Sequence, residues 1–240
     1  MTDTDRPRHC LVTGANRGLG LEFVRQLLAR GDRVLATCRQ PGRAQALNRL
    51  VAEHPGRLHV LPLDVGVPRT HAELLRELPL VSGGVSEPVD LLINNAGVLH
   101  SGESFGAVTA ENLDDSLRTN ASGPFLLTQA LAPLLANGAT VANVSSKLGS
   151  IASTERFGTP SYAISKAALN MVTVLLAHAL ADRGITVLAM HPGWVRTDMG
   201  GDSAELEPAI AVADLLAVIG RADGAASGSF LDRHGAALPW

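Results

Sequence analysis

The chain reads Thr13-Gly14-Ala15-Asn16-Arg17-Gly18-Leu19-Gly20 between a short apolar stretch and the start of a helical pattern. Gly14 allows a tight turn, Gly18 lets the backbone approach a pyrophosphate, and Gly20 lets the helix pack closely on the strand. The amino end of a helix also attracts phosphate charge, so the turn predicts a dinucleotide site. A glycine-rich surface turn is the alternative, because the spacing departs from G-x-G-x-x-G. No Gly-Lys-Ser or Gly-Lys-Thr follows, which argues against a P-loop.

Around this turn, short apolar runs alternate with longer helical patterns along the whole chain. This alternation is typical of a parallel sheet with helices on both faces. The first helix has Phe23 and Leu27 at helical spacing, and Gly31 supplies a stop signal. We therefore predict an α/β fold: a doubly wound Rossmann-type parallel sheet of about seven strands in a single domain, 1–240. The predicted strands are 10–13, 33–38, 58–63, 89–94, 140–144, 185–191 and 229–232, with a surface loop at 83–88.

Composition excludes several classes of protein. The chain has 240 residues, of which 46% are hydrophobic, and a formal net charge of −3, so it can bury a core and is not disordered. It lacks a basic tract, which argues against nucleic-acid binding. The two cysteines, Cys10 and Cys38, have no CxxC spacing and the histidines no ligand spacing, so we expect no metal site and a cytoplasmic protein. We see no apolar run approaching the roughly 18 residues of a membrane span and expect no membrane contact.

The end of the second predicted strand bears on cofactor specificity. An NAD site commonly carries an acidic side chain about 20 residues beyond the glycine turn, where it binds the ribose 2′-hydroxyl, whereas a 2′-phosphate favours arginine. Here the strand ends in Cys38-Arg39, and Arg17 in the turn could supply a second guanidinium. Both could instead be solvated loop arginines. The missing carboxylate predicts that NADP(H) is preferred over NAD(H).

The single tyrosine of the chain lies four residues before one of its two lysines, in Tyr162-Ala-Ile-Ser-Lys166. On a helix these two side chains share a face. A neighbouring ammonium stabilises phenolate, so we expect Lys166 to lower the pKa of Tyr162 from its ordinary value of about 10. Such a pair suits general acid–base catalysis. A core tyrosine with a lysine snorkelling beside it is the structural alternative.

Together these motifs resemble the short-chain dehydrogenase/reductase family along nearly the whole chain. The glycine turn looks like the family's cofactor turn, Asn94-Asn95-Ala96-Gly97 like its fourth-strand motif, and Pro192-Gly193 like its turn beyond the sixth strand. The residues that match its catalytic tetrad are Asn120, Ser146, Tyr162 and Lys166. The separation of 16 residues between the serine and the tyrosine is a few residues longer than is common in the family.

The resemblance implies a role for each member of the tetrad. Tyr162 would protonate the carbonyl oxygen as hydride arrives, or deprotonate the alcohol in reverse, and Lys166 would lower its pKa and hold the nicotinamide ribose. Ser146 would hydrogen-bond the substrate oxygen, and is preferred to Ser145 because the family's serine is the second of such a pair. Asn120 would hold a water that links the lysine to solvent. Alternatively, the serine only caps a turn and the asparagine only satisfies a local backbone break.

The resemblance also implies cofactor contacts beyond the carboxyl ends of the strands. Asp64 would meet the adenine amino group, with Val65 lining the ring, although an Asp after a strand is also an ordinary turn former. We expect the substrate pocket to be formed by 147–161 and 193–208. The full set of expected cofactor contacts is Gly14, Asn16, Arg17, Gly18, Leu19, Gly20, Arg39, Asp64, Val65, Asn95, Ala96, Gly97, Tyr162, Lys166, Pro192, Val195 and Thr197.

The predicted function is hydride transfer between NADP(H) and a small carbonyl or alcohol substrate, as an NADPH-dependent carbonyl reductase. Within the family, 191–200 and 238–240 look most like the branch that contains Sniffer carbonyl reductase and the C-factor signalling protein. The second hypothesis is therefore a dinucleotide-binding signalling or redox-sensing protein that needs no turnover. The apolar residues around a predicted helix at 161–181 are compatible with a homodimer or homotetramer, or with packing inside one chain.

Overall fold

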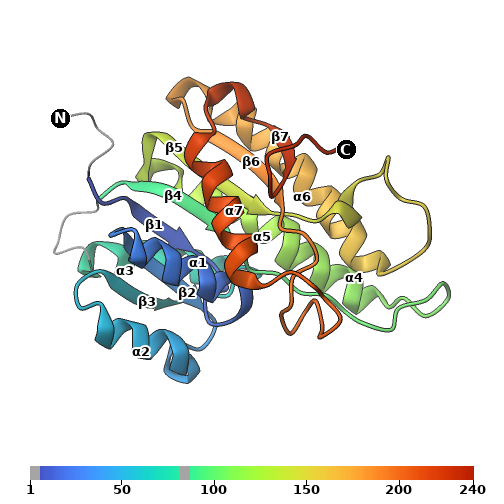
Figure 1. The fold of residues 1–240 in the computed structure, drawn as a ribbon, viewed down its shortest axis with the longest axis horizontal. Coiled ribbons are helices and arrows are strands. Elements are labelled where there is room, and N and C mark those ends of the chain that lie inside the picture. Colours follow the sequence, from blue (N-terminus) through green and yellow to red (C-terminus); the bar gives the residue numbers. More distant parts are fainter. Residues whose placement is uncertain (1–5, 82–86) are drawn as a thin grey trace.

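The computed structural model describes residues 6–81 and 87–240 and has three layers (Figure 1). Its 7-stranded sheet has the order β3-β2-β1-β4-β5-β6-β7, and every neighbouring pair is parallel. This confirms the predicted doubly wound fold. The strands are β1 His9–Val12, β2 Arg33–Cys38, β3 Leu58–Pro62, β4 Val89–Asn94, β5 Leu135–Val144, β6 Thr186–His191 and β7 Ser229–Asp232. The helices are α1 Gly18–Ala29, α2 Gln45–Glu53, α3 Pro68–Val81, α4 Ala110–Leu117, α5 Gly123–Leu131, α6 Pro160–Ala179 and α7 Pro208–Arg221.

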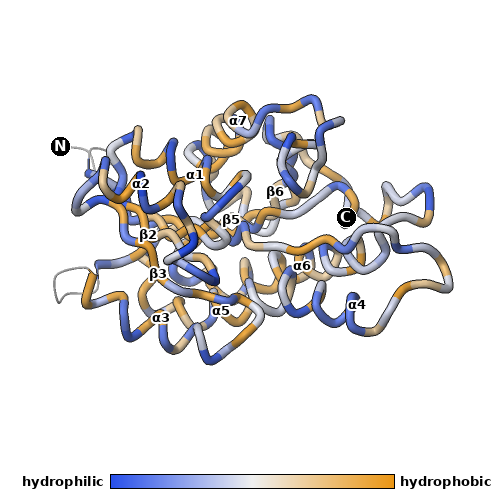
Figure 2. The backbone as a smooth tube through the Cα atoms, turned by 90° about the horizontal axis from the view of Figure 1, so that it is seen from below, coloured by the Kyte–Doolittle hydropathy of each residue, from blue (hydrophilic) through white to orange (hydrophobic). Residues whose placement is uncertain are grey.

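Side chains alternate along each strand and so supply both faces of the sheet. Cys10 and Val12 of β1 belong to one apolar core and Leu11 to the other, while Leu91 and Leu92 of β4 divide in the same way. Helices α1, α2 and α7 cover the first face, and α3, α5 and α6 cover the second (Figure 2). Because both faces are buried, the strands read as continuous apolar runs. Most of the predicted loop, 83–86, lies outside the described residues.

The strand order places a switch point in the middle of the sheet. From β1 the chain builds outward through β2 and β3, and β4 then starts the other half on the opposite side of β1. Ligands of open α/β sheets bind beyond the carboxyl ends of the strands at such a point. The segments that follow β1, β4, β5 and β6 all leave the sheet at this edge.

The fifth strand is longer than predicted. β5 begins at Leu135 rather than at residue 140, because Leu135 pairs with Val89. Asn137 and Gly138 lie where the register then shifts, and such turn-type residues hide the start of the strand from the sequence pattern. The Arg183 guanidinium donates to the Leu135 carbonyl, which ties the early part of the strand to the chain after α6.

Helix α6 corrects one expectation drawn from composition. Within the described residues it alone is long and apolar enough to cross a membrane by length and hydropathy, with a mean hydropathy of 1.2. The prediction that no segment approaches this limit is therefore wrong. The helix nevertheless packs on the sheet and buries Tyr162, Lys166 and Asn170. Core helices satisfy the same two criteria, so these properties describe a core helix as well as a span.

Candidate active site

The predicted site residues lie in segments that follow the strands at the carboxyl edge, or in the helices beside them. The glycine turn joins β1 to α1, and the π-helical turn that carries Asn120 joins α4 to α5. Tyr162 and Lys166 lie in the first turns of α6. The remaining predicted residues each follow a strand. Arg39 follows β2, Asp64 and Val65 follow β3, and Asn95, Ala96 and Gly97 follow β4. Ser146 follows β5, and Pro192, Val195 and Thr197 follow β6.

The glycine turn is held against the segment that follows β4. Thr13 Oγ1 accepts hydrogen bonds from the N–H groups of Asn95 and Ala96, both at 3.0 Å. The Asn95 amide donates to the carbonyls of Thr13 at 2.9 Å and Gly14 at 3.2 Å. Gly14 has a φ of +62°, and a Cβ on Gly20 would lie 2.3 Å from the Gly14 oxygen. Thr13 begins the glycine motif but was not among the predicted site residues, although its place between strand and glycine was a usable signal.

The segment after β6 reaches the other side of the glycine turn. A Cβ on Gly18 would lie 3.4 Å from the Thr197 methyl carbon. Arg17 Nη1 pairs with Asp198 Oδ2 at 2.9 Å, with the two side chains 66% and 75% exposed. An exposed pair of this kind contributes only about 0–1 kcal/mol. Arg39 is exposed after β2, and within residues 6–81 and 87–240 no hydrogen bond or ion pair engages its side chain, which makes it the freer guanidinium.

Tyr162 and Lys166 face the carboxyl end of β5 together. Tyr162 is 8% exposed and shares a side-chain hydrogen bond with Ser146. Lys166 is 4% exposed and donates from Nζ to the Val144 carbonyl at 2.7 Å. The same Nζ lies 5.5 Å from the centre of the Tyr162 ring. The spacing of four residues therefore places both side chains on one helix face, as predicted.

Burial dominates the acid–base properties of this pair. It raises the pKa of Tyr162 to about 12, and the hydrogen bond with Ser146 lowers that value only in part. Burial also lowers the pKa of Lys166 to about 8, because desolvation disfavours the charged form of either group. In the protein without a bound cofactor, the prediction that Lys166 lowers the pKa of Tyr162 below its ordinary value is therefore wrong. A phenol kept neutral in this way is suited to donating a proton.

The two neighbouring serines have different partners. Ser145 Oγ donates to Asn170 Oδ1 at 2.6 Å inside the protein. Ser146 Oγ accepts from the Leu148 N–H at 3.2 Å and caps a short 3₁₀ turn, which was the structural alternative for this residue. Its hydroxyl also meets Tyr162. The contacts therefore favour Ser146 over Ser145 as the serine that shares a substrate oxygen with the tyrosine.

Asn120 is fully buried in the π-helical turn Arg118–Ser122. Its side chain accepts from the Val98 N–H and donates to the Val98 carbonyl, both at 2.8 Å, so it satisfies a local backbone break as the alternative proposed. Gly97 lies between it and the lysine, because a Cβ there would be 3.2 Å from Asn120 Oδ1 and 3.8 Å from Lys166 Nζ. π-helical turns recur at functional sites. The structure thus brings Asn120 and Lys166 to the same place.

Asp64 forms a turn after β3, which was the alternative role considered for it. Its Oδ1 accepts from the Gly66 N–H at 3.0 Å, and its backbone carbonyl accepts from Thr70 Oγ1 at 2.7 Å. Val65 is buried in the core on the α3 side of the sheet. These contacts do not involve an adenine ring, so the expected role of Asp64 and Val65 at the adenine stays a prediction.

Further polar side chains, which were not among the predicted site residues, support the site. His191 Nδ1 accepts from the Lys147 N–H at 3.2 Å, and burial lowers the pKa of His191 to about 4, so the ring stays neutral and able to accept.

Asn94 donates to Asn143 Oδ1, and Asn143 donates to Thr173 Oγ1, both at 2.9 Å. This chain links β4, β5 and α6. Amides inside apolar strands were the signal, because buried polar groups require partners.

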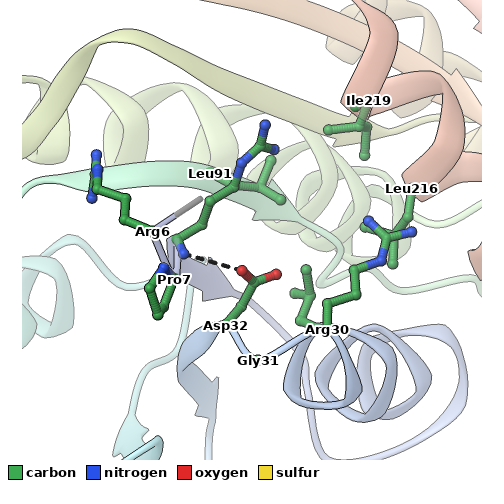
Figure 3. A pocket seen from close by; sticks show the side chains of 11 residues that line it. Arg6, Pro7, Arg30, Gly31, Asp32, Leu91, Leu216 and Ile219 are labelled. Atoms are coloured by element: carbon green, nitrogen blue, oxygen red, sulfur yellow. Dashed lines mark hydrogen bonds between the residues drawn. The ribbon is translucent and has the colours of Figure 1, made fainter. Parts of the chain in front are cut away.

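Two cavities lie at the opposite edge of the sheet. One of about 320 Å³ is lined by residues that include Arg6 and Asp32 (Figure 3), and a second of about 330 Å³ shares Arg6. Both lie where β1 and β2 begin, whereas Tyr162 lies at the carboxyl edge. They do not bear on a pocket formed by 147–161 and 193–208, which stays a prediction. In the part of the chain that the structure describes, no three His, Cys, Asp or Glu side chains are grouped to hold a metal ion.

Known proteins resemble this chain in both sequence and structure. The family model for short chain dehydrogenase matches residues 8–207. C-signal from Myxococcus xanthus is 41% identical over 155 residues, which cover 64% of this chain and 93% of that protein. Carbonyl reductase Sniffer of D. melanogaster is 32% identical with a TM-score of 0.92, covering 98% of this chain and 100% of that one. The NADPH-bound carbonyl reductase from chicken fatty liver is 36% identical with a TM-score of 0.91 and the same coverage of 98% and 100%.

These similarities agree with the order of motifs along the chain. The family match includes the glycine turn, the segment after β4, the tetrad and the segment after β6. The likeness to Sniffer and to C-signal confirms the branch expected from 191–200 and 238–240. The chain therefore belongs to the short-chain dehydrogenase/reductase family, in the branch that contains Sniffer carbonyl reductase and C-signal, and is an oxidoreductase of that family.

Proposed function

We propose that this chain is an NADPH-dependent carbonyl reductase that converts small aldehydes or ketones into alcohols. The proposal rests on one observation: the side chains of Tyr162, Ser146 and Lys166 lie together at the carboxyl end of β5. A phenol and a hydroxyl that share a hydrogen bond can together bind one carbonyl oxygen. The similar Sniffer and chicken enzymes, both carbonyl reductases, support this reaction class.

The glycine turn fits a nicotinamide dinucleotide. No side chain caps the amino end of α1, so its first N–H groups are free to bind a phosphate. Gly14 and Gly20 keep the turn free of side chains where a Cβ would collide with backbone. Bound there, the cofactor would supply the hydride. The residues after β4 and β6 lie on either side of the turn and would hold its nicotinamide half.

The tetrad residues would handle the substrate oxygen and its proton. Tyr162 donates the proton to the carbonyl oxygen, and burial keeps its hydroxyl protonated until then. Ser146 stabilises the charge that develops on the same oxygen. The ammonium of Lys166 stabilises the phenolate left behind. Asn120, which lies beside Lys166 across Gly97, would connect the lysine to solvent through a water so that the tyrosine can be reprotonated.

The substrate would enter between 147–161 and 193–208. Both segments present apolar side chains to solvent, which favours substrates with an apolar body. The exposed apolar residues of these segments are Leu148, Ile151, Phe157, Trp194 and Met199.

NADPH oxidation by the purified protein tests the proposed function. The panel should contain small aldehydes, ketones and quinones, and NADPH binding should be measured in parallel by fluorescence. We expect turnover with at least one class. A folded protein that binds NADPH but turns over none of them would contradict the proposal.

Arg39 should decide the choice between the two cofactors. We expect wild-type protein to bind NADPH at least about tenfold more tightly than NADH, because the free guanidinium can form paired hydrogen bonds with a 2′-phosphate. Arg39→Asp should reverse this preference, since a carboxylate repels the phosphate and accepts from the 2′-hydroxyl. Arg49→Asp on the exposed side of α2 is the charge-matched control. Equal affinities in wild type would contradict the assignment.

A signalling role is the second candidate, favoured by the similarity to C-signal. Such a role could require the bound dinucleotide without turnover. A Tyr162 variant without reductase activity separates the two: it would keep the cellular role if signalling needs only binding, and lose it if turnover is required.

We also propose that the protein forms homo-oligomers and is located in the cytoplasm. Ile164, Met171 and Leu175 are 49%, 60% and 52% exposed and lie along one side of α6, which supports a homodimer or larger oligomer that light scattering would detect. Cys10 and Cys38 are free and buried, as suits a reducing compartment.

A further inference from the structure

The segment between β4 and α4 provides a side chain that holds the start of α6. Glu103 Oε2 accepts from the Ser161 N–H at 3.1 Å and from the Ser161 hydroxyl at 2.7 Å. Its other oxygen accepts from Asn112 at 3.4 Å. Ser161 is fully buried and directly precedes Tyr162. A single carboxylate therefore fixes the backbone one residue before the proposed proton donor.

The beginning of α6 needs this outside partner. Thr159 precedes the helix with φ 41°, in the left-handed region, and its side chain forms no capping bond. Among the described residues it is the sole non-glycine with positive φ, a conformation that costs free energy. Pro160 at the first helical position has no N–H. The next N–H, of Ser161, would have no partner within the helix, and a carboxylate suits the positive end of the helix dipole.

A second contact joins the same two segments. The rings of Phe105 and Phe157 pack edge to face with their centres 5.8 Å apart. Phe105 lies two residues from Glu103, and Phe157 lies four residues before Ser161. The two segments extend from the same end of the molecule, beyond α4 and the start of α6 (Figure 1). The bonds of Glu103 and this aromatic contact thus join the same two segments beside the proposed substrate entrance.

We propose that Glu103 is a positioning residue for the reaction: it fixes the first turn of α6 so that the Tyr162 hydroxyl meets Ser146 and the substrate oxygen. The inference rests on the proposed function. It adds a residue that lies outside the tetrad and acts on Tyr162 through Ser161. The hydrogen bonds from Ser161 to the Glu103 carboxylate are charge-assisted and therefore stronger than bonds between neutral groups. Their loss should displace the neighbouring tyrosine.

The central experiment compares three replacements of this carboxylate. Glu103→Ala should lower kcat about tenfold or more, because displacing a reacting group by a fraction of an ångström is costly. The Kd for NADPH should stay within about twofold, since the glycine turn is held by other residues. Glu103→Gln keeps an acceptor oxygen for Ser161 and should recover most of kcat. Glu111→Ala removes an exposed carboxylate from the first turn of α4 and should leave kcat unchanged.

A double-mutant cycle tests whether Glu103 acts through Tyr162. In a Tyr162→Phe background, Glu103→Ala should cause a further loss of less than about twofold, because the group it positions is already gone. An equal tenfold loss in that background would overturn the proposal. So would a Glu103→Ala variant with wild-type kcat, or a Glu103→Gln variant as impaired as the alanine.

Titration of the single tyrosine gives a readout that does not depend on turnover. Stopped-flow pH jumps followed by tyrosinate absorbance report Tyr162 alone. Burial raises the pKa of Tyr162 to about 12, and Glu103→Ala should lower it as the helix start loosens and water reaches the hydroxyl. An identical titration in both proteins would overturn the proposal. If wild type reduces no carbonyl, the proposed function fails while this titration still tests the positioning role.

Discussion

Tyr162→Phe should lower kcat for carbonyl reduction by a factor of about 10³, because it removes the general acid and leaves hydride delivery intact. The chain has one tyrosine, so no second phenol can replace it. The affinity for NADPH should remain within about twofold, since one hydroxyl contributes little to binding a large cofactor. Steady-state kinetics together with cofactor fluorescence separate these two effects.

Two controls define this result. Ser145→Ala removes a hydroxyl that bonds Asn170 rather than the tyrosine, and should retain most of kcat if the protein keeps its melting temperature. Ser146→Ala should fall between that variant and Tyr162→Phe, because the phenol can still donate its proton. A Tyr162→Phe variant with more than a tenth of the wild-type kcat would rule out this tyrosine as the proton donor.

The raised pKa of Tyr162 bears on the direction of the reaction. A phenol with a pKa of about 12 remains protonated at neutral pH, which suits donation to a carbonyl oxygen. Alcohol oxidation would instead need the phenolate. From the sequence alone we expected Lys166 to favour that phenolate, because four-residue spacing predicts proximity. Spacing does not predict burial, and here burial raises the pKa of Tyr162 and lowers that of Lys166.

The sequence was informative wherever one pattern determined one structure. The strands at 33–38, 89–94 and 229–232 have the predicted limits, because each apolar run is bounded by polar or turn residues. The start of β5 was missed, since Asn137 sits inside the strand. The break between α4 and α5 is a π-helical turn, which has no distinct sequence period.

Within the site, residues in short motifs were predictable and residues in long-range contacts were not. The glycine turn and the pair of Tyr162 and Lys166 are visible in the sequence because their spacing has a direct structural meaning. Glu103 contacts Ser161 across 58 positions of the chain, and His191 contacts Lys147 across 44. Such contacts depend on the strand order, which brings distant segments to the same edge of the sheet.

Gly20→Ala should greatly weaken NADPH binding and destabilise the protein. Gly20 lies inside α1 without a positive φ, so a conformational preference is not the reason. The added Cβ would lie 2.3 Å from the Gly14 oxygen and 2.5 Å from Asn95 Nδ2, two atoms that are joined by a hydrogen bond. Relieving these contacts must move α1 away from the turn. We expect the Kd for NADPH to rise at least about a hundredfold and stability to fall by about 1–3 kcal/mol.

Gly220→Ala is the matched control, because Gly220 also lies in a helix, α7, and a Cβ there would meet nothing within 4 Å. Alanine is the better helix former, so this variant should melt at or slightly above the wild-type temperature and bind NADPH normally. The two substitutions are chemically identical and differ only in what surrounds the new methyl group. If Gly20→Ala bound NADPH as well as Gly220→Ala, close packing of helix on turn could not be what shapes the cofactor site, and the phosphate would have to be held elsewhere.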